Sequence, residues 1–275
     1  MNDYKGYCEL ELDDAELSEI YTHSRLNGYL FHENEYLLVK APDGEIIDEF
    51  CYQGGQLRKV KYVTCNNVYC GTVKPRNPQQ KLAMDMLADK STKVKVVRGV
   101  YGSGKDYLML NMALDLIQKN KFDKIVYVRP NVTVKGLPDI GYLKGTVWEK
   151  LSWTFGPIAD KVGGDQGVDF LVSEGKLEVM PLLFIRGRSF DNSIVYMSEG
   201  QNMNTEIAKL LLGRIGENSE LWINGDTHQT DKDLFEKDNG IDKMIERLRD
   251  NELFSYVYLP KTERSAVANL ANLLD

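Results

Sequence analysis

Apolar residues recur with two alternating spacings from residue 79 onward. Segments 79–89, 105–120, 204–215 and 242–250 place apolar residues three or four positions apart, as amphipathic helices do. Short apolar runs, typical of buried strands, occur at 93–100, 124–130, 177–182, 193–199, 219–225 and 254–260. This alternation predicts an α/β fold, in which a parallel sheet carries helices on both faces. Ligands of such sheets bind at the carboxyl ends of the strands.

Residues 1–74 have a different pattern, which predicts a small, mostly β N-terminal module. Two β-rich runs within 28–52 are joined by the strong turn sequence at 42–44 (PDG), and further short strands are expected in 57–73. Residues 13–24 predict one short helix, with Asp13 or Asp14 as its cap. Two prolines in 73–78 mark an extended linker, so a second domain is expected over residues 75–275.

Composition and charge narrow the class of protein further. The 275 residues are 43% hydrophobic and 27% charged, which is ordinary for a globular protein and argues against disorder. The net charge is −7, and residues 1–75 carry most of it, with 7 Lys and Arg against 13 Asp and Glu. The sequence therefore lacks a basic coat for nucleic acid, which would have to be held by a local patch or in a groove completed by several subunits.

The sequence also bears on cellular compartment. No stretch approaches the roughly 18 apolar residues of a membrane span, and the N-terminus has acidic residues in place of the apolar part of a secretory signal. We therefore expect a cytoplasmic protein of a bacterial or phage-infected cell, with no membrane contact. Cys8, Cys51, Cys65 and Cys70 are expected to be free thiols there. Only two of them are close in sequence, so a zinc site is not favoured.

The segment 99–106 (GVYGSGKD) lies between a predicted strand and a predicted helix. It follows the G-x-x-x-x-G-K pattern of a phosphate-binding loop, except that Asp106 stands where Ser or Thr is usual. Glycines let backbone N–H groups approach a polyphosphate, the helix start adds its positive end, and Lys105 reaches the β- and γ-phosphates. A glycine-rich turn without a ligand is the less favoured alternative. The expected nucleotide-binding residues are Gly99, Val100, Tyr101, Gly102, Ser103, Gly104, Lys105, Asp106 and Tyr107.

A second chemical element ends the predicted strand 193–199 with Ser198 and Glu199. Nucleotide-hydrolysing sheets usually end this strand with Asp-Glu, the Asp for the magnesium shell and the Glu to polarise water. Here the loop supplies the carboxylate, Asp106, and the strand supplies the hydroxyl, Ser198. We favour an exchange of the two groups over decay of the site, because Mg²⁺ accepts carboxylates from any direction. The exchange predicts that Asp106 and Ser198 share a magnesium site within hydrogen-bond reach of each other.

Polar residues 224–229 (NGDTHQ) end the next predicted strand. At the carboxyl end of a parallel strand, one strand away from Glu199, this cluster can contact a γ-phosphate and the attacking water. Asp226 and Gln229 are therefore candidate catalytic residues. The alternative is a turn that caps the next helix.

Together these motifs resemble the PhoH-like family of P-loop ATPases, whose nucleotide site is similar to that of superfamily-one helicases. The resemblance covers about residues 75–275 and rests, in order, on 77–80, 99–106, 129–130, 186–188, 198–202, 214–216 and 225–229. It implies a P-loop NTPase sheet, ATP binding and hydrolysis, activity directed at RNA, and ring-shaped oligomers. The first module looks like the β-rich connector of longer relatives that carry a PIN ribonuclease domain. We expect no PIN domain here, so ribonuclease activity is not implied.

Other residues are assigned more loosely. In helicase-like ATPases a glutamine at the position of Gln80 reads adenine, and the alternative is an exposed residue at a helix start. Arg264 and Arg188, then Arg186 and Arg214, are candidates for stabilising charge at the γ-phosphate from the same or a neighbouring chain, the alternative being surface ion pairs. Segment 131–165 contains aromatic residues and lysines that could bind single-stranded nucleic acid by stacking and phosphate contacts: Trp148, Trp153, Phe155, Lys135, Lys144 and Lys150. The alternative is a helix that uses its Trp residues for core or subunit contacts.

Three functions of different classes remain open. The favoured one is an ATPase, with ATP and Mg²⁺ as cofactors, that acts on RNA or single-stranded nucleic acid. Its catalytic groups would be Lys105, Arg188, Glu199, Asp226, Gln229 and Arg264. The second is a switch or assembly protein that binds ATP but barely hydrolyses it. A small-molecule phosphotransferase is least favoured, because Glu199 followed by the 225–229 motif suits water activation better than binding of an acceptor.

Overall fold

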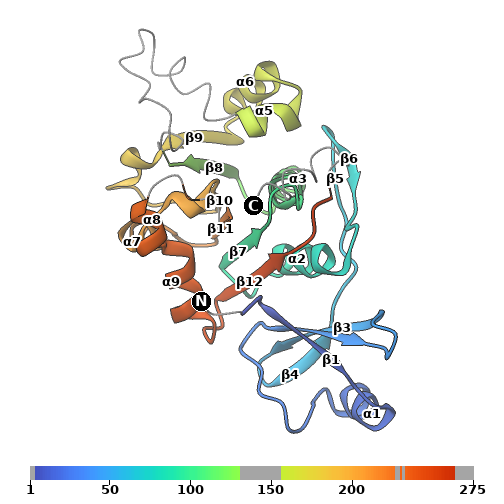
Figure 1. The fold of residues 1–275 in the computed structure, drawn as a ribbon. Helices are drawn as coiled ribbons and strands as arrows, with labels where there is room; N and C mark the ends of the chain where they lie inside the picture. The colour runs from blue at the N-terminus through green and yellow to red at the C-terminus, as the bar shows by residue number, and fades with distance from the viewer. Residues whose placement is uncertain (1–3, 131–155, 227–229, 231–232, 264–275) are drawn as a thin grey trace.

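The computed structural model describes residues 4–130, 156–226, 230 and 233–263. Its larger sheet has six strands in the order β12-β7-β11-β10-β8-β9, and every neighbouring pair is parallel (Figure 1). The strands are β7 (Val94–Gly99), β8 (Lys124–Arg129), β9 (Leu177–Pro181), β10 (Ser193–Met197), β11 (Glu220–Gly225) and β12 (Phe254–Leu259). All six predicted strands are present, and the predicted parallel α/β sheet is confirmed.

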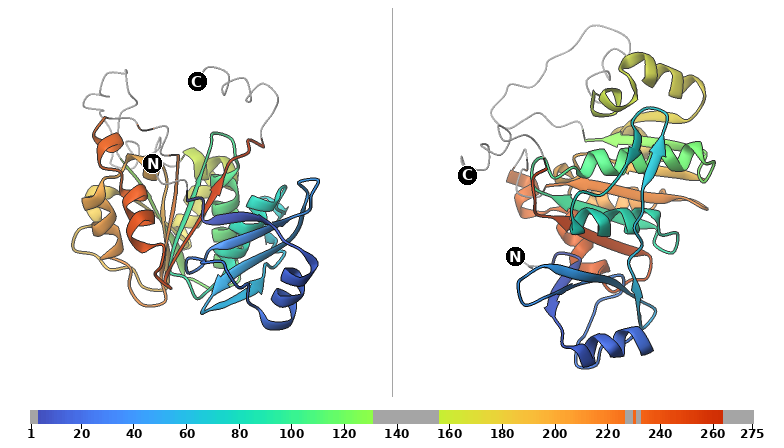
Figure 2. Two further views of the ribbon diagram at one scale, coloured as in Figure 1. Left: turned by 60° about the horizontal axis from the view of Figure 1, so that its bottom comes forward. Right: turned by 90° about the vertical axis from the view of Figure 1, so that its right-hand side faces the viewer.

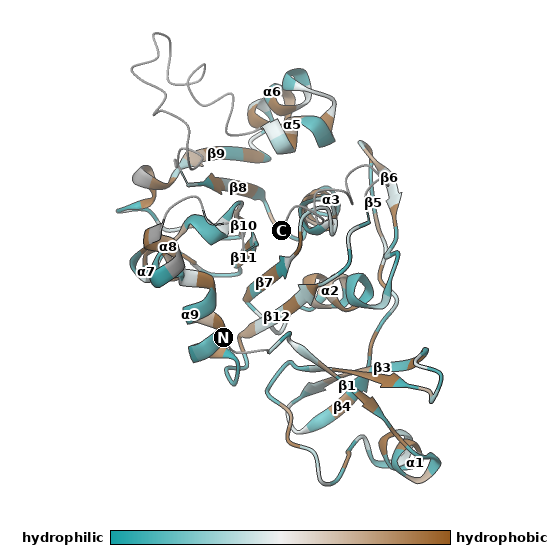
Figure 3. Ribbon diagram, in the orientation of Figure 1, coloured by the Kyte–Doolittle hydropathy of each residue, from teal (hydrophilic) through white to brown (hydrophobic). Residues whose placement is uncertain are grey.

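Helices cover both faces of this sheet, as the layers in Figure 2 show. One face packs against α2 (Pro78–Ala88), α3 (Lys105–Gln118), α5 (Gly156–Val162) and α6 (Asp165–Ser173), and the other against α7 (Thr205–Leu212) and α9 (Gly240–Leu248). Successive strand residues point to opposite faces, so Val97 joins the first core and Val96 the second. Hydrophobic residues therefore run along the central strands (Figure 3).

Several short elements have no counterpart among the predictions. They are α5, α6, α8 (Asp233–Lys237) and the 3₁₀ turns η2 (Leu182–Ile185) and η3 (Gly200–Asn202). Helices this short show at most two or three turns of apolar periodicity, which is too little to separate from a loop. In the described ranges, no helix has the length and apolar character needed to cross a membrane.

The N-terminal module is a four-stranded sheet in the order β1-β2-β3-β4, with one helix. Its elements are β1 (Tyr7–Glu11), α1 (Asp14–His23), β2 (Tyr36–Lys40), β3 (Ile46–Gln53) and β4 (Gln56–Lys59). β1 runs parallel to β2, while β2-β3 and β3-β4 are antiparallel. Asp13 caps α1, since its carboxylate accepts from Glu16 N at 2.8 Å and the Glu16 carboxylate accepts from Asp13 N at 3.0 Å. The small, mostly β module is thus confirmed.

A separate hairpin, β5 (Cys65–Asn67) and β6 (Gly71–Val73), leaves this sheet and packs against α3. Asn67 Nδ2 donates to Asn111 Oδ1 at 2.8 Å, and Asn66 N donates to Asp115 Oδ1 at 2.9 Å. The domain boundary predicted after residue 74 therefore follows a hairpin that packs against the predicted second domain. The four cysteines are free thiols, and burial raises the pKa of Cys65 to about 11.

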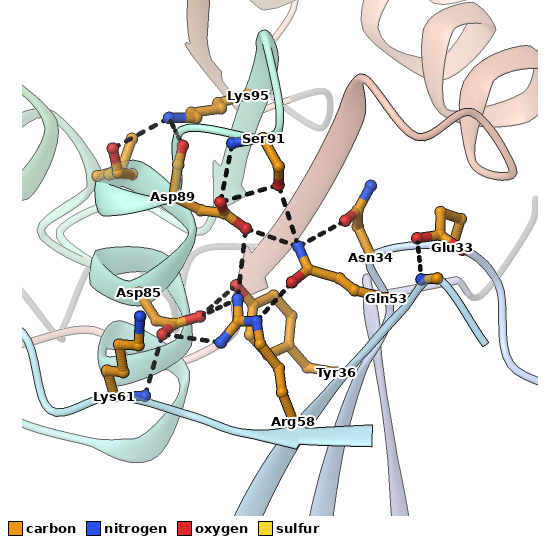
Figure 4. Close-up of polar contacts among 12 residues, drawn as sticks. Glu33, Asn34, Tyr36, Gln53, Arg58, Lys61, Asp85, Asp89, Ser91 and Lys95 are labelled. Carbon is orange, nitrogen blue, oxygen red and sulfur yellow. Dashed lines mark hydrogen bonds and ion pairs between the residues drawn. The ribbon is translucent and has the colours of Figure 1, made fainter. Parts of the chain in front are cut away.

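A buried polar network joins the module to α2 (Figure 4). Its centre is Asp85, whose side chain is 2% exposed. Arg58 of β4 binds this carboxylate with two hydrogen bonds of 3.1 and 2.8 Å. The Tyr36 hydroxyl and the Lys61 backbone N–H each donate to it at 3.0 Å. Every lone pair of the buried carboxylate thus faces a donor, which is the condition for burying a charge at low cost.

A second arm of the network reaches β12. Gln53 Nε2 donates to Asp89 Oδ2 at 2.6 Å and to Asn34 Oδ1 at 2.8 Å, and Asn34 Nδ2 donates to Phe254 O at 2.8 Å. Burial favours a neutral Asp89, but hydrogen bonds from Gln53 and Ser91 and the charge of Arg58 outweigh it and hold the pKa of this carboxyl below its usual value. The module is therefore bonded at both α2 and the edge strand of the large sheet.

We expect Asp85→Ala to lower the free energy of unfolding by about 3–5 kcal/mol, because it strands the Arg58 guanidinium and the Tyr36 hydroxyl in a buried contact. Chemical denaturation at neutral pH measures this loss. The control is Lys209→Ala, which breaks an exposed ion pair with Glu206 and should leave the midpoint of unfolding almost unchanged. A loss below about 1 kcal/mol for Asp85→Ala would show that the network does not hold the module.

Candidate functional site

The glycine loop connects the end of β7 to the start of α3, as predicted. Gly102 and Gly104 have φ angles of 72° and 85°, in the left-handed region that favours glycine. Gly99 is required for a different reason: a Cβ there would lie 2.7 Å from Ser103 Oγ and 2.8 Å from Leu259 O. α3 therefore begins at a loop whose backbone is closely enclosed by its neighbours.

The chain after β12 lies along this loop. Val100 N donates to Leu259 O at 3.1 Å, Thr262 Oγ1 donates to Tyr101 O at 2.9 Å, and Glu263 N donates to Gly102 O at 3.0 Å. The first bond uses a loop N–H and the other two occupy loop carbonyls, so the N–H groups at the start of α3 remain as the donors toward a ligand.

Gln80, at the first turn of α2, supports the loop from the other side and is only 3% exposed. Its Nε2 donates to Ser103 O at 3.0 Å, and its Oε1 accepts from Arg76 N at 2.9 Å. The alternative of an exposed helix-start residue is therefore wrong. The amide also lines the cleft described next, and its adenine-reading role stays a prediction.

The loop opens into a cleft of about 410 Å³ at the carboxyl ends of the central strands. Lys105 lies in its wall, with Nζ donating to Gly99 O at 3.1 Å and to Val100 O at 3.3 Å. The other lining residues are Lys74, Arg76, Gln80, Tyr101, Gly102, Gly104, Asp106, Tyr107, Leu108, Lys161, Glu199, Gln201, Asn224, Asp226 and Glu263. Four of the predicted catalytic and metal groups, Lys105, Asp106, Glu199 and Asp226, thus share one cleft.

Asp106, the first-turn residue of α3, has partners that differ from the expected one. Its Oδ1 accepts hydrogen bonds from the Tyr196 hydroxyl, at 2.7 Å, and from Asn224 Nδ2. Asn224 Nδ2 also donates to the Tyr196 hydroxyl at 2.7 Å, which closes a triangle of three side chains. Burial, followed by the nearby Asp106 charge, raises the pKa of Tyr196 well above its usual value, so this hydroxyl stays protonated and donates.

Ser198 does not take part in this triangle. Its side chain is fully buried, and its Oγ has no hydrogen-bond partner of normal geometry among the described residues. The predicted contact between Asp106 and Ser198 is therefore wrong, because Tyr196 and Asn224 hold the carboxylate instead. A shared magnesium site for Asp106 and Ser198 stays a prediction without that support.

Glu199 follows β10 in a left-handed backbone conformation, with φ 55°. Its backbone N donates to Asn224 Oδ1 at 3.0 Å, and its Oε2 accepts from Gln201 Nε2 at 2.6 Å. Arg129 Nη2 lies 3.9 Å from its other carboxylate oxygen. A non-glycine residue in this region is uncommon and marks a place where the surrounding structure determines the backbone.

Of the arginine candidates, the three that the structure describes, Arg186, Arg188 and Arg214, do not line the cleft. Arg188 donates to Glu178 at 2.5 Å and lies 5.2 Å from the Phe190 ring, while Arg186 is exposed and Arg214 is partly buried. Outside the described residues lie Arg264, Gln229, Trp148, Trp153, Phe155, Lys135, Lys144 and Lys150. Arg264 directly follows Glu263, a residue of the cleft wall. Asp226 is 4% exposed and its N–H donates to Gln201 Oε1 at 3.2 Å.

Comparison with known proteins identifies the chain. The family profile described as PhoH-like protein matches residues 72–271. The chain belongs to the PhoH family. It is 32% identical over 217 residues to Protein PhoH2 of Mycolicibacterium smegmatis, which covers 78% of this chain and 49% of that protein. Protein PhoH2 of Bacillus subtilis is 29% identical over 285 residues, covering 98% of this chain and 63% of that protein.

A shorter match links the chain to Protein PhoH of Escherichia coli, with 29% identity over 187 residues, 66% of this chain and 52% of that protein. The chain thus spans about half to two thirds of the length of these relatives. Membership of the PhoH family makes this a P-loop protein of the nucleotide-binding type, and the matched residues include the glycine loop and the residues that line the cleft.

The donor set fits a divalent cation that arrives with a nucleotide. No group of three or more His, Cys, Asp or Glu side chains that could hold a metal occurs in the part of the chain the structure describes. Mg²⁺ at nucleotide sites is bound by one or two carboxylates and by the phosphates themselves. Asp106 supplies one carboxylate in the cleft, and its Oδ2 makes no hydrogen bond within the described ranges.

Sequence reasoning missed part of this site. It gave no role to Lys74, Arg76, Lys161, Tyr196 or Glu263. Asn224 and Gln201 lie inside the recognised segments 224–229 and 198–202, but neither was singled out as a site residue. Tyr196 lies inside an apolar strand, where its spacing looks like that of any core residue.

We expect Gly99→Ala to weaken nucleotide binding and lower the melting temperature, because its Cβ would come within 2.8 Å of the Leu259 carbonyl and shift the loop. Overpacking of this kind costs about 1–3 kcal/mol. Calorimetry of binding and thermal unfolding measure the two effects. Gly156→Ala is the control, since its Cβ meets no atom within 4 Å, and it should change neither value. Equal behaviour of the two variants would contradict this account of the loop.

Proposed function

We propose that the protein binds ATP in the cleft and hydrolyses it. The observation that carries the proposal is the glycine loop at the start of α3, which shares one cleft with Lys105 and Glu199. Its volume of about 410 Å³ is within the range of small-molecule sites. The loop presents backbone N–H groups and the positive end of a 14-residue helix to a polyphosphate.

Each group in the cleft has a task in this reaction. Lys105 exchanges its two bonds to loop carbonyls for oxygens of the β- and γ-phosphates. Glu199, held by Gln201 and Arg129, accepts a proton from the attacking water. Mg²⁺ would neutralise charge that develops on the phosphates, with Asp106 as its carboxylate ligand. Asp226 contacts the γ-phosphate. The Gln80 amide supports the loop and binds the adenine ring.

We further propose that the protein acts on RNA or single-stranded nucleic acid as a ring-forming oligomer. This follows from the motif resemblance and from two features of the chain. The chain has a net charge of −7, whereas a monomer that binds nucleic acid non-specifically would need an excess of positive charge. Arg188 is remote from its own cleft and exposed enough, at 42% of its side chain, to serve a neighbouring subunit.

One observation favours a second function, an ATP-binding switch or assembly protein with weak hydrolysis. Ser198, directly after β10, places a neutral hydroxyl where hydrolysing sheets usually carry a carboxylate. If Asp106 does not replace that carboxylate, nucleotide binding would persist while turnover would be lost.

An ATPase assay with Mg²⁺, with and without single-stranded RNA and DNA, separates the two functions. We expect turnover, stimulated by RNA or single-stranded nucleic acid. Glu199→Gln should keep ATP affinity and lower the turnover rate by about 10²- to 10⁴-fold, the usual contribution of a general base. ATP binding with no turnover in the unmodified protein would favour the switch, and an unchanged rate in Glu199→Gln would remove its assigned role.

Lys105→Ala should weaken ATP binding by about tenfold to a hundredfold, because it removes charge-assisted hydrogen bonds of about 1.5–3 kcal/mol each to the phosphates. Lys119→Ala is the matched control, because Lys119 lies at the C-terminal end of α3, where it pairs with Asp115. Isothermal titration with ATP should find the control equal to the unmodified protein. Unchanged affinity in Lys105→Ala would refute the phosphate-binding assignment of the loop.

A further inference from the structure

Asn224 joins three parts of the cleft that come from different elements. It is the second-last residue of β11 and is 1% exposed. Its Nδ2 donates to Asp106 Oδ1, on α3, and at 2.7 Å to the Tyr196 hydroxyl, on β10. Its Oδ1 accepts from the backbone N of Glu199 at 3.0 Å. Both ends of one buried amide are therefore engaged with groups of the nucleotide site.

Tyr196 completes the arrangement from inside the sheet. Its side chain is fully buried, its ring stacks on Tyr127 with centroids 5.6 Å apart, and its hydroxyl donates to Asp106 Oδ1 at 2.7 Å. Stacking fixes the ring, so the hydroxyl can reach only a narrow region at the start of α3. Two donors converge on one carboxylate oxygen, and Asp106 Oδ2 keeps its lone pairs.

A carboxylate beside the glycine loop presents an electrostatic problem, because it carries the same sign of charge as the phosphates. Hydrogen bonds from two buried donors stabilise the charge on Oδ1 and draw that oxygen toward the strand ends. An uncharged Ser198 is consistent with this arrangement, since it adds no second carboxylate at the end of β10.

We propose that Tyr196 and Asn224 are positioning residues that hold the Asp106 carboxylate in place for a nucleotide-bound divalent cation. Through Glu199 N, Asn224 also links the position of that carboxylate to the backbone that carries Glu199. Asp106 stands where the loop usually has Ser or Thr, and the residues that donate hydrogen bonds to its carboxylate are thus Tyr196 and Asn224, and not Ser198. This inference rests on the proposed binding of ATP with Mg²⁺.

The test is a pair of double-mutant cycles read as ATP affinity, in saturating Mg²⁺ and in excess chelator. One cycle uses Asp106→Ala with Asn224→Ala, and the other uses Asp106→Ala with Ser198→Ala. We expect Asn224→Ala to weaken binding about tenfold in Mg²⁺ and less than about threefold in chelator, and to add almost nothing once Asp106 is removed. The effects of Asp106→Ala and Ser198→Ala should be additive.

Tyr196→Phe keeps the ring and its stacking, so it tests the same idea if Asn224→Ala does not fold. It should weaken Mg²⁺-dependent binding about fivefold to tenfold. Tyr127→Phe is its matched control, because the buried Tyr127 hydroxyl in the stacked ring interacts with Ser198 and, among the described residues, only Tyr196 and Asn224 donate to the Asp106 carboxylate. The control should leave the Mg²⁺ dependence unchanged.

The outcomes separate this inference from the proposed function. A wild-type protein that binds no ATP refutes the proposed function and this inference with it. A wild-type protein that binds ATP with Mg²⁺, but in which Asp106 and Asn224 act additively, refutes this inference alone. Equal losses for Asn224→Ala in Mg²⁺ and in chelator would also refute it, because they would mean general support of the fold.

Discussion

The parallel pairing of β7, β11 and β10 is the constraint on which the candidate site depends. Parallel strands in register end at one edge of the sheet, so the three segments that follow these strands meet there. β7 delivers the glycine loop, β11 ends in Asn224 and Gly225 with Asp226 directly after, and Glu199 comes shortly after β10. Asp106, which follows the loop, is 90 positions from Tyr196 and 118 from Asn224 in sequence, and no local interaction could assemble them.

The same edge shows how closely backbone segments must pack to form such a site. Gly99 passes Leu259 and Ser103 without room for a Cβ, and Gly200 is similarly close to the carbonyl of Asn224. The glycines thus have separate tasks: two adopt left-handed angles in the loop, and others allow strand ends to approach. Rigid neighbours on both sides keep the loop from relaxing away from the geometry that a phosphate needs.

Helix α2 connects the site to the N-terminal module. Gln80, in its first turn, donates a hydrogen bond to Ser103 O in the loop. Asp85, further along the helix, accepts hydrogen bonds from Arg58 and Tyr36 of the module. The β5-β6 hairpin adds a contact on α3, the helix that begins at the loop. Both α2, which supports the glycine loop through Gln80, and α3, which begins at that loop, are therefore in contact with the N-terminal part of the chain. This part of the chain packs against the two helices next to the candidate site.

Sequence patterns alone determined the strand and helix alternation, the β-rich module, the glycine loop and the placement of Glu199 and Asp226 at strand ends. Those features are local: apolar spacing, turn chemistry and a motif at a strand-to-helix junction need only neighbouring residues. Tertiary structure decided what Asp106 touches. The sequence favoured Ser198, which directly follows β10, but the buried hydroxyl that reaches the carboxylate belongs to Tyr196, two residues earlier in β10. Residues two positions apart along a strand point to the same face, so spacing along the chain could not choose between Tyr196 and Ser198. The packing of α3 against the sheet sets the position of Asp106, and only there is it decided that the Tyr196 hydroxyl reaches it.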